Sequence, residues 1–279
     1  VELTGAIETA LRDGHSEIRA QRGTQLWQFD LSRTGEPGAE AGTVILAFDI
    51  TEQERAELSR REFTANVSHE LKTPLQGIIG SAELIENGMV KPEDLPRFVG
   101  HIRKEAQRLV TLIGDIIRLS QLDEGVELPR EPVDLRALSQ EVARDLDSAA
   151  KQKNVALRVE GEPAVVQGVR RLLYETVYNL CDNAIQYNVN GGSVTLRTEK
   201  AGQEARITVA DTGIGIPQDA QARVFERFYR VDKSHSKASG GTGLGLSIVK
   251  HAVQYHNGKI ALQSTPGHGT SITVTIPEM

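Results

Sequence analysis

Three polar residues of one helical segment, His69, Glu70 and Thr73, have the types and spacing that phosphoryl transfer to a side chain requires. At about 100° per residue, the apolar stripe of this segment centres between Val67 and Leu71, so His69 faces solvent on the opposite side. Thr73 lies one turn on from His69, and Glu70 is the neighbouring carboxylate. A neutral imidazole attacks phosphorus well when a carboxylate holds the proton of its second nitrogen. An exposed helical histidine is most often plain surface, so the rest of the chain must support this interpretation.

Two asparagines further along have the chemistry of metal ligands. Asn179 and Asn183 lie four residues apart in a helical run, so their side chains share one face. Amide oxygens are hard ligands that suit Mg²⁺, which keeps most of its water. Such a pair taken alone is usually a polar surface.

A carboxylate and two glycine-rich strings offer contacts for a nucleotide. In DTGIGIP, Asp211 ends an alternating strand, and its carboxylate can accept the exocyclic amine of adenine while rejecting guanine. In GGTGLGLSIVK, glycines stand at the start of a helix, where backbone N–H groups and the helix dipole favour anions. The glycines of the two strings that can approach a ligand are Gly213, Gly215, Gly241, Gly243 and Gly245. Either string taken alone is more often an ordinary loop.

Length and composition bound the molecule that positions these residues. The 279 residues are enough for about two domains, and the formal net charge of −6 with dispersed Lys and Arg excludes nucleic acid as the main partner. Cys181 is the single cysteine, so no internal disulfide forms. No apolar stretch approaches the roughly 20 residues that span a bilayer. Because the chain starts at Val1 without an initiator Met, we expect any membrane or sensing segment to lie upstream.

Residues 51–124 predict an antiparallel hairpin of two long helices. Apolar residues recur at three- and four-residue spacing on both sides of a break at 88–92, and Thr51 with Glu54 predicts a capping box at the start. A hairpin cannot bury both stripes alone, so we expect two copies to form a four-helix bundle. The first stripe comprises Phe63, Val67, Leu71, Leu75, Ile78, Ala82 and Ile85, and the second Leu95, Phe98, Ile102, Leu109, Leu112, Ile113, Ile116 and Leu119.

The whole chain is predicted to be α+β, with a linker at 125–132 and a second domain at 133–279. Separate helical and strand patterns there predict an α/β sandwich with a mixed, mostly antiparallel sheet and helices on one face. The helices are expected near 135–151, 170–187 and 244–255, and the strands near 155–159, 194–198, 205–210, 259–264 and 271–276.

Residues 1–50 predict a strand hairpin from 25–30 and 44–50, with few apolar side chains for a core. The exit AFDITEQER resembles the last strand and exit of a PAS sensor domain. We therefore expect the end of a truncated PAS-like domain, with an unrelated hairpin as the alternative.

From about residue 60 to 279, the ordered strings resemble the sensor histidine kinases of two-component systems. FTANVSHELKTPL resembles their H box, NLCDNAIQYN the N box, DTGIGIP the G1 box, FERFYR the F box, GGTGLGLSIVK the G2 box and TPGHGTSITV the last glycine box. All of them appear in the family's order. The resemblance implies the cytoplasmic portion of a membrane-anchored bacterial sensor that acts as a homodimer.

By this resemblance, His69 accepts the γ-phosphoryl group of ATP and Glu70 is its acid/base partner. The phosphoryl group then passes to an aspartate in the receiver domain of a separate response regulator. Thr73 holds the family's phosphatase position, where it orients the water that hydrolyses the regulator's phospho-aspartate. A hydroxyl that bonds back to its own helix is the alternative for Thr73.

The resemblance also implies a Mg-ATP site. Asn183 is expected to ligate Mg²⁺ with Asn179 as its partner, Tyr187 to stack on adenine, and Asp211 to bind its amine. Arg227 or Arg230 is expected to reach the γ-phosphate, and Phe225 and Phe228 either anchor the following loop or belong to the core. The remaining expected contacts are Gly213, Gly215, Gly241, Thr242, Gly243, Leu244, Gly245 and Thr270.

One residue departs from the family pattern. Gln186 stands where these kinases commonly carry a Lys or Arg that contacts phosphate, and Lys233 or Lys237 is the expected replacement. Two other classes share the nucleotide motifs: an ATP-driven conformational machine, and a dimeric scaffold without catalysis. The first needs a catalytic carboxylate where the chain has Asn179, and the intact His69 and Glu70 argue against the second.

Overall fold

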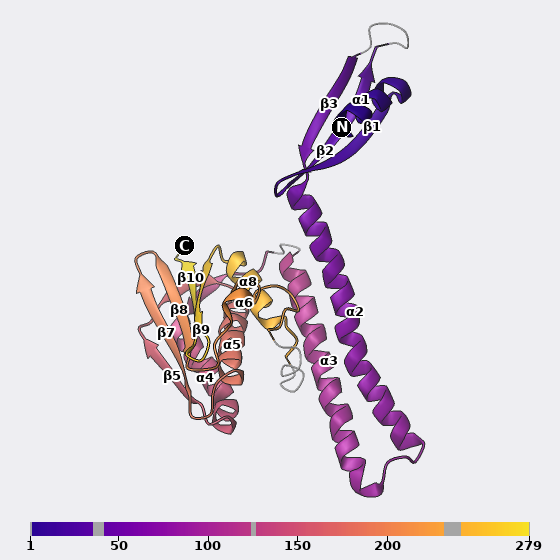
Figure 1. Cartoon of the computed structure of the whole chain (residues 1–279). Helices are drawn as coiled ribbons and strands as arrows, with labels where there is room; N and C mark the ends of the chain where they lie inside the picture. Colours follow the sequence, from indigo (N-terminus) through magenta and orange to yellow (C-terminus); the bar gives the residue numbers. More distant parts are fainter. Residues whose placement is uncertain (1, 36–41, 124–126, 232–240, 279) are drawn as a thin grey trace. The chain divides into compact units, whose positions relative to one another are not determined.

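The computed structural model describes residues 2–35, 42–123, 127–231 and 241–278 (Figure 1). The chain divides into two compact units, residues 1–68 and 69–279, and one long helix runs through the boundary. The chain combines long helices with sheets whose strands pair mostly antiparallel, so the predicted α+β class is confirmed.

The first unit carries a small antiparallel sheet. The hairpin predicted from the sequence is present as β2 (Gln25–Thr34) and β3 (Gly42–Asp49). The structure adds two elements that were not predicted, α1 (Glu2–Asp13) and β1 (His15–Arg22), the latter pairing with β2. The buried core of this sheet is limited to Ala6, Ala10 and Leu31, while apolar side chains of β3 such as Phe48 stay exposed. Few buried contacts therefore hold this sheet together.

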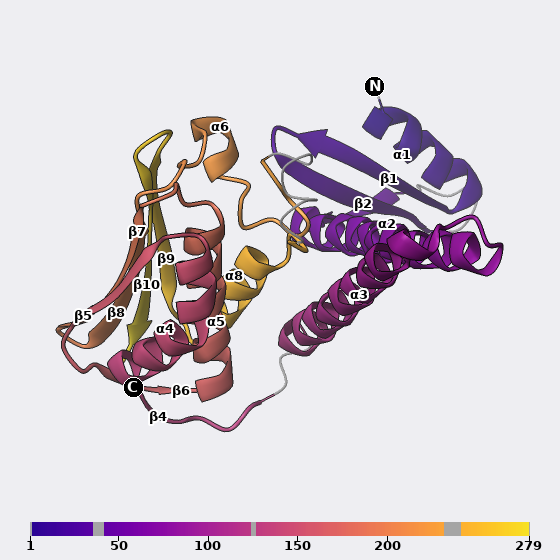
Figure 2. The ribbon, with the colours of Figure 1, turned by 90° about the horizontal axis from the view of Figure 1, so that it is seen from below.

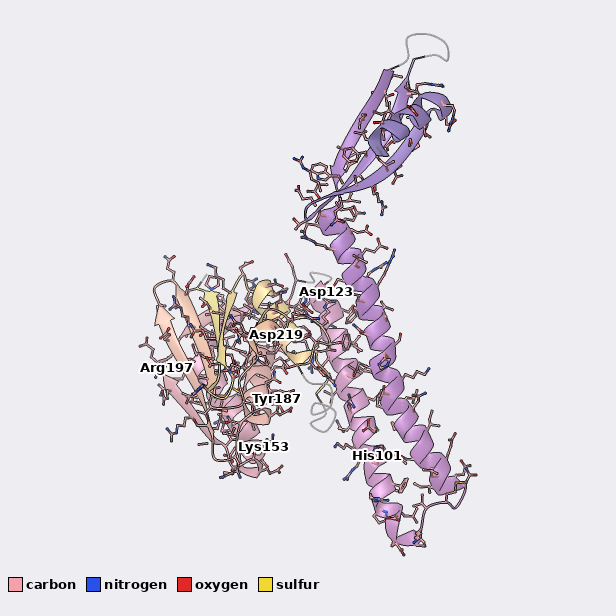
Figure 3. All side chains as sticks on the ribbon, viewed as in Figure 1. His101, Asp123, Lys153, Tyr187, Arg197 and Asp219 are labelled. Atoms are coloured by element: carbon pink, nitrogen blue, oxygen red, sulfur yellow. The ribbon has the colours of Figure 1, made fainter. Side chains whose placement is uncertain are left out.

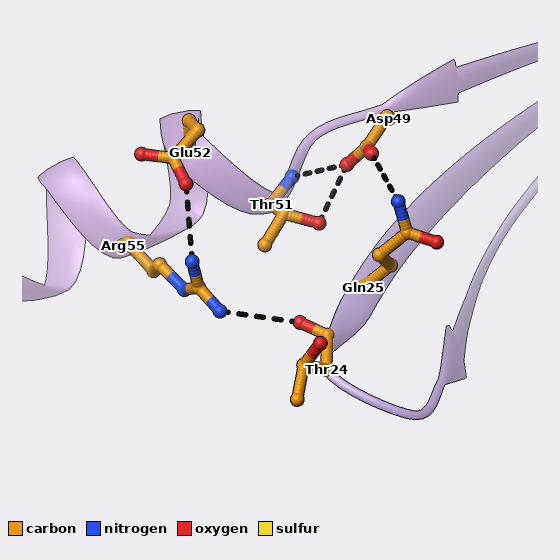
Figure 4. Close-up of a pocket in the computed structure, with 6 residues that line it drawn as sticks. All are labelled: Thr24, Gln25, Asp49, Thr51, Glu52 and Arg55. Carbon is orange, nitrogen blue, oxygen red and sulfur yellow. Dashed lines mark hydrogen bonds and ion pairs between the residues drawn. The ribbon is translucent and has the colours of Figure 1, made fainter.

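Asp49 fixes the start of the first long helix, α2 (Thr51–Glu86) (Figure 4). Its carboxylate accepts bonds from the Thr51 N–H at 3.0 Å and the Thr51 hydroxyl at 2.5 Å, and from Gln25 Nε2 at 3.1 Å. Arg55 donates to Glu52 and to the Thr24 carbonyl at the edge of the same pocket of about 270 Å³. The predicted capping box is wrong, because the Thr51 hydroxyl donates to Asp49, the residue that caps the helix.

The predicted helical hairpin consists of α2, a short 3₁₀ turn η1 (Pro92–Asp94) and α3 (Leu95–Asp123). α3 buries Leu112 and Leu119, but many apolar side chains of the hairpin remain exposed in the single chain. The exposed ones in residues 69–123 are Leu75, Ile79, Leu84, Met89, Val99, Val110, Ile113 and Ile117. None of the helices in the described ranges combines the length and apolar character needed to span a membrane.

A five-stranded sheet in the order β5-β7-β8-β10-β9 forms the scaffold of the C-terminal half. β5 and β7 pair in parallel and the other neighbours pair antiparallel, as predicted for a mixed, mostly antiparallel sheet. The strands are β5 (Ala156–Gly161), β7 (Ser193–Ala201), β8 (Glu204–Asp211), β9 (Lys259–Thr265) and β10 (Gly269–Pro277).

Three helices cover one face of this sheet: α4 (Leu135–Gln152), α5 (Arg170–Gln186) and α8 (Gly245–Tyr255) (Figure 2). Alternate strand residues such as Leu196 and Ile207 point into the core that these helices complete. The sequence missed the two-stranded sheet of β4 (Glu131–Asp134) and β6 (Val165–Gly168) and the short α6 (Gln218–Gln221). β4 begins within residues 125–132, the range expected to be linker.

His256 links the end of α8 to the start of α5. Its side chain is 1% exposed, Nε2 accepts from the Val169 N–H at 2.9 Å, and Nδ1 donates to the Ala252 carbonyl at 2.7 Å. The bond from the Val169 N–H requires a neutral imidazole, because a nitrogen that accepts cannot carry a proton. Burial lowers the pKa of His256 below its ordinary value, and the nearby Arg130 adds to this shift while the Ala252 bond opposes it.

The buried His256 predicts a loss of stability in acid. Because the folded-state pKa lies below the unfolded value of about 6.5, unfolding takes up a proton, and the stability present above that pH falls as the pH drops. His256→Gln should lower the free energy of unfolding at pH 8 by about 1–3 kcal/mol, since a glutamine amide does not reproduce the geometry by which one ring bonds to both the Val169 N–H and the Ala252 carbonyl. The free energy of unfolding of the variant should also depend less on pH than that of the parent. Thermal melting between pH 5.5 and 8 measures both effects, and a parent whose melting temperature does not fall in acid contradicts the neutral imidazole.

Candidate phosphoacceptor and nucleotide sites

His69 lies exposed on α2, as the helical periodicity predicts, and Thr73 is exposed one turn further on. The Thr73 hydroxyl donates to the His69 carbonyl at 3.3 Å, which is the back-bonded alternative considered for this residue. Glu70 is half-buried, and two guanidinium groups reach the same carboxylate oxygen, Oε2: Arg108 Nη2 at 3.5 Å and Arg230 Nη2 at 3.7 Å. The carboxylate of Glu70, the acid/base candidate, is therefore contacted by two cations, and the neighbouring His69 is accessible.

Asp211 ends β8 with one carboxylate oxygen committed to the backbone and the other available. Oδ1 accepts from the Gly213 N–H at 2.8 Å and from the Thr270 N–H at 3.2 Å. Burial raises the pKa of Asp211 above its ordinary value, and these two N–H donors oppose that rise. No donor from the described residues bonds to Oδ2, so this oxygen is free to accept an amine.

Tyr187 and the turn after Asp211 lie against each other. The Ile214 N–H donates to the Tyr187 carbonyl at 3.1 Å, and a Cβ on Gly213 would stand 2.4 Å from that carbonyl oxygen. Only a glycine therefore allows this approach. Tyr187 is 42% exposed at the end of α5 (Figure 3), so a ligand can reach its side chain.

Asn179 and Asn183 occupy one half-buried face of α5, as their spacing predicts. The start of α8 meets this face, since a Cβ on Gly245 would stand 3.4 Å from Asn179 Oδ1. The amide oxygen of Asn179 thus lies beside a helix N-terminus that favours anions, and Asn183 follows one turn later on the same face of α5. These residues fit a hydrated Mg²⁺ on the phosphates of a nucleotide, with the carboxylate of Asp211 left for the base.

The F box and the G2 box are bonded to each other. The Phe228 N–H donates to the Gly243 carbonyl at 2.9 Å, and both residues have positive φ, +62° for Phe228 and +73° for Gly243. Arg230 donates to the Gly241 carbonyl at the other end of the same glycine string. Phe225 and Phe228 are half-buried, so neither is a fully buried core residue. Arg230 therefore stands between the glycine string and Glu70.

Two predicted nucleotide contacts in the G2 box make other interactions. The Thr242 hydroxyl donates to Asp115 Oδ2 on α3 at 2.9 Å and accepts from the Leu244 N–H at 3.3 Å. The Leu244 side chain is fully buried, so only its backbone is available to a ligand. Gly215 has φ +70° and lies against the Thr265 carbonyl, where it shapes the turn that supports Asp211.

Further ion pairs join α3 to the C-terminal half, and no sequence motif pointed to them. Arg118 of α3 pairs with Glu175 of α5 at 3.2 Å. At the end of α3, Asp123 accepts from Arg227 at 2.7 Å and lies 3.4 Å from His251 of α8. The partners stand 57 to 128 residues apart, so only the folded chain brings them together. Arg227, one of two candidates for the γ-phosphate, is committed to Asp123 and His251 in this structure.

Gln186, the residue that departs from the expected pattern, is neutral and bonds within its own helix. Its amide donates to Asp182 at 2.8 Å, and Lys153 reaches its backbone carbonyl at 2.5 Å. Lys153 is therefore the cation that the structure places at the end of α5. Lys233 and Lys237, the replacements expected from the sequence, lie outside the described residues.

Two family models match separate parts of the chain. Residues 59–125 match the His Kinase A (phospho-acceptor) domain, and residues 168–279 match the histidine kinase-, DNA gyrase B- and HSP90-like ATPase. The first range contains His69, and the second contains every candidate nucleotide contact from Asn179 to Thr270.

Named relatives belong to one class of protein. The sensor-like histidine kinase SenX3 of Mycolicibacterium smegmatis is 42% identical over 237 residues, which cover 84% of this chain and 62% of the relative. The sensor protein kinase WalK of Staphylococcus haemolyticus is 36% identical over 246 residues, which cover 87% of this chain and 40% of the relative. The chain thus spans less than two thirds of the length of these relatives.

Solved structures agree with the fold. Full-length ShkA in complex with AMPPNP matches with a TM-score of 0.59 and 28% identity, over 77% of this chain and 45% of that one. The histidine kinase ThkA in complex with the response regulator protein TrrA matches with a TM-score of 0.64 and 23% identity, over 100% of this chain and 83% of that one. Since the phosphoacceptor and ATPase models and both named relatives point the same way, the chain belongs to the sensor histidine kinases of two-component systems.

Proposed function

We propose that the chain binds Mg-ATP in its C-terminal half and autophosphorylates on His69. The observation that carries this proposal is the position of Arg230. Its guanidinium lies 3.7 Å from Glu70, the neighbour of His69, and donates to the carbonyl of Gly241 in the glycine string. One side chain thus joins the acceptor helix to the expected phosphate site, which supports transfer between them.

The chemistry is in-line displacement at phosphorus. A nitrogen of His69 attacks the γ-phosphorus, the N–P bond forms, and ADP leaves with the electrons of the broken P–O bond. Glu70 takes the proton of the second imidazole nitrogen as positive charge develops on the ring. Mg-ATP supplies the phosphoryl group and the metal that neutralises its charge. Asn179 and Asn183 hold the metal, and Asp211 and Tyr187 hold the base.

The proposed organisation has a dimerisation and acceptor hairpin at 51–124, a linker at 125–132 and an ATP-binding domain at 133–279. Exposed apolar side chains on α2 and α3, such as Leu75, Ile79 and Val110, support a homodimer that buries them in a four-helix bundle. A PAS-like sensor segment at 1–50 completes the proposal. We further propose that the chain is the cytoplasmic portion of a membrane-anchored bacterial sensor.

The test of this function is incubation of the purified chain with Mg²⁺ and γ-labelled ATP. We expect label that is lost in acid and stable in alkali, as a phosphoramidate requires, and that passes to the aspartate of a response regulator receiver domain. Bound ATP without label would favour a non-catalytic scaffold, and phosphate release without labelled protein would favour an ATPase.

Phosphatase activity on the regulator is a second proposed function, supported by the exposed hydroxyl of Thr73 one turn from His69. Thr73→Ala should leave autophosphorylation unchanged and slow dephosphorylation of the regulator by about 10- to 100-fold, because the attacking water loses its orienting group. Thr64→Ala is the matched control, since Thr64 is also exposed on α2 and makes the same back-bond, to Arg60 at 3.0 Å. Equal phosphatase rates in both variants would indicate that the Thr73 hydroxyl only bonds back to its own helix and has no part in the phosphatase reaction.

A further inference from the structure

Arg108 lies on α3 and contacts the carboxylate next to His69, although no sequence motif drew attention to it. Its side chain is 14% exposed, with Nη2 3.5 Å from Glu70 Oε2 and Nη1 4.0 Å from Glu105 Oε2. Removing one partner of an ion pair that is shielded from water in this way is costly, because the other partner is left as an uncompensated charge. Arg108 is thus built into the surroundings of Glu70.

Arg230 contacts the same oxygen of Glu70 as Arg108 does. Its side chain is 11% exposed and its Nη2 lies 3.7 Å from Glu70 Oε2. Burial lowers the pKa of Arg230, Glu70 opposes that shift, and Arg108 adds to it. The two guanidinium groups therefore repel each other, and Glu70 is the anion that both of them contact.

The two arginines differ in what else they can reach. Arg230 donates to the Gly241 carbonyl in the glycine string, so phosphate groups bound there would offer it a second anion. Arg108 pairs within the hairpin, with Glu70 and with Glu105 one turn earlier on α3. If Arg230 turns to the nucleotide, Arg108 still holds Glu70.

We propose that Arg108 is a positioning residue for phosphoryl transfer: it keeps Glu70 in place beside His69 after the phosphates of a nucleotide have drawn Arg230 away. This inference rests on the proposed autokinase function. In the transfer step Glu70 gains the imidazole proton while the N–P bond forms and ADP departs. Arg108 neither touches the nucleotide nor gains or loses a proton.

The variant Arg108→Gln removes the charge and retains polarity. We expect kcat for autophosphorylation to fall about tenfold and KM for ATP to stay within about twofold, because only the orientation of Glu70 changes. Arg108→Lys should recover part of the lost rate. Arg103→Gln, an exposed arginine on the same helix, is the matched control and should behave as the parent.

A double-mutant cycle with Glu70→Gln separates positioning from general damage to the hairpin. If Arg108 acts through Glu70, Arg108→Gln should cost no further rate in the Glu70→Gln background. The inference would be overturned by an equal loss of autophosphorylation rate in both backgrounds or by a faster Arg108→Gln chain. It would also be overturned if a lowered melting temperature of Arg108→Gln accounted for the lost rate. A labelled parent with an unaffected Arg108→Gln chain overturns this inference alone, whereas a parent that takes up no label overturns the proposed function with it.

Discussion

His69→Gln should take up no label from γ-labelled ATP, while its affinity for ATP stays within about twofold of the parent. The glutamine keeps polarity and approximate size on an exposed helical face, but it has no nitrogen that can attack phosphorus. No bond from His69 to the candidate nucleotide residues appears among the described contacts, so binding should survive the change. Label measured after gel separation, beside equilibrium ATP binding, tests both parts of the prediction.

His101→Gln is the control, because His101 lies on the same hairpin (Figure 3) with its side chain 51% exposed. Its ring bonds to Ser81 at 3.2 Å and lies outside the proposed site, so labelling should match the parent. Full labelling of the His69→Gln chain would move the acceptor to another residue and remove the basis for the proposed role of Glu70.

The helices and strands were largely predictable because their patterns are local. The apolar stripes of α2 and α3 and the alternation in β8 can be read within a few turns or residues of chain. α1 and β1 were missed since little in their sequence is buried, and β4 and β6 since each has only four residues. Thr51 was assigned the wrong partner because Asp49, two residues earlier, competes for its hydroxyl.

The candidate site was predictable only where its residues are close in sequence. Asn179 and Asn183 share a helix face, and Asp211 bonds to Gly213, so spacing was sufficient. The neighbours of Glu70 depend on contacts across long stretches of chain: Arg108 comes from the second helix of the hairpin and Arg230 from the F box. The pairing of Thr242 with Asp115 spans 127 residues. Such contacts follow from packing between elements, which periodicity within one element does not encode.

Asp211→Asn should weaken ATP binding by about 10- to 150-fold, the equivalent of about 1.5–3 kcal/mol for a charged hydrogen bond. The substitution is nearly isosteric, and an asparagine Oδ1 can still accept from the Gly213 and Thr270 N–H groups, so the turn should keep its shape. The oxygen that faces the ligand is replaced by an NH₂ group, which meets the exocyclic amine of adenine donor to donor. Isothermal titration with ATP and with ADP measures the loss.

The same substitution should change which base is preferred, and this distinguishes a lost contact from a damaged fold. Guanine presents a carbonyl where adenine has its amine, so the NH₂ group introduced by Asp211→Asn should narrow the preference for ATP over GTP. Asp219→Asn is the control, since Asp219 is exposed on α6 shortly after the turn (Figure 3). Loss of affinity for both nucleotides in equal proportion would indicate a distorted turn, and an unchanged affinity for ATP would place the base elsewhere. A narrowed preference with a normal melting temperature would identify Asp211 as the residue that selects adenine, because no change in backbone shape alone reverses the direction of one hydrogen bond.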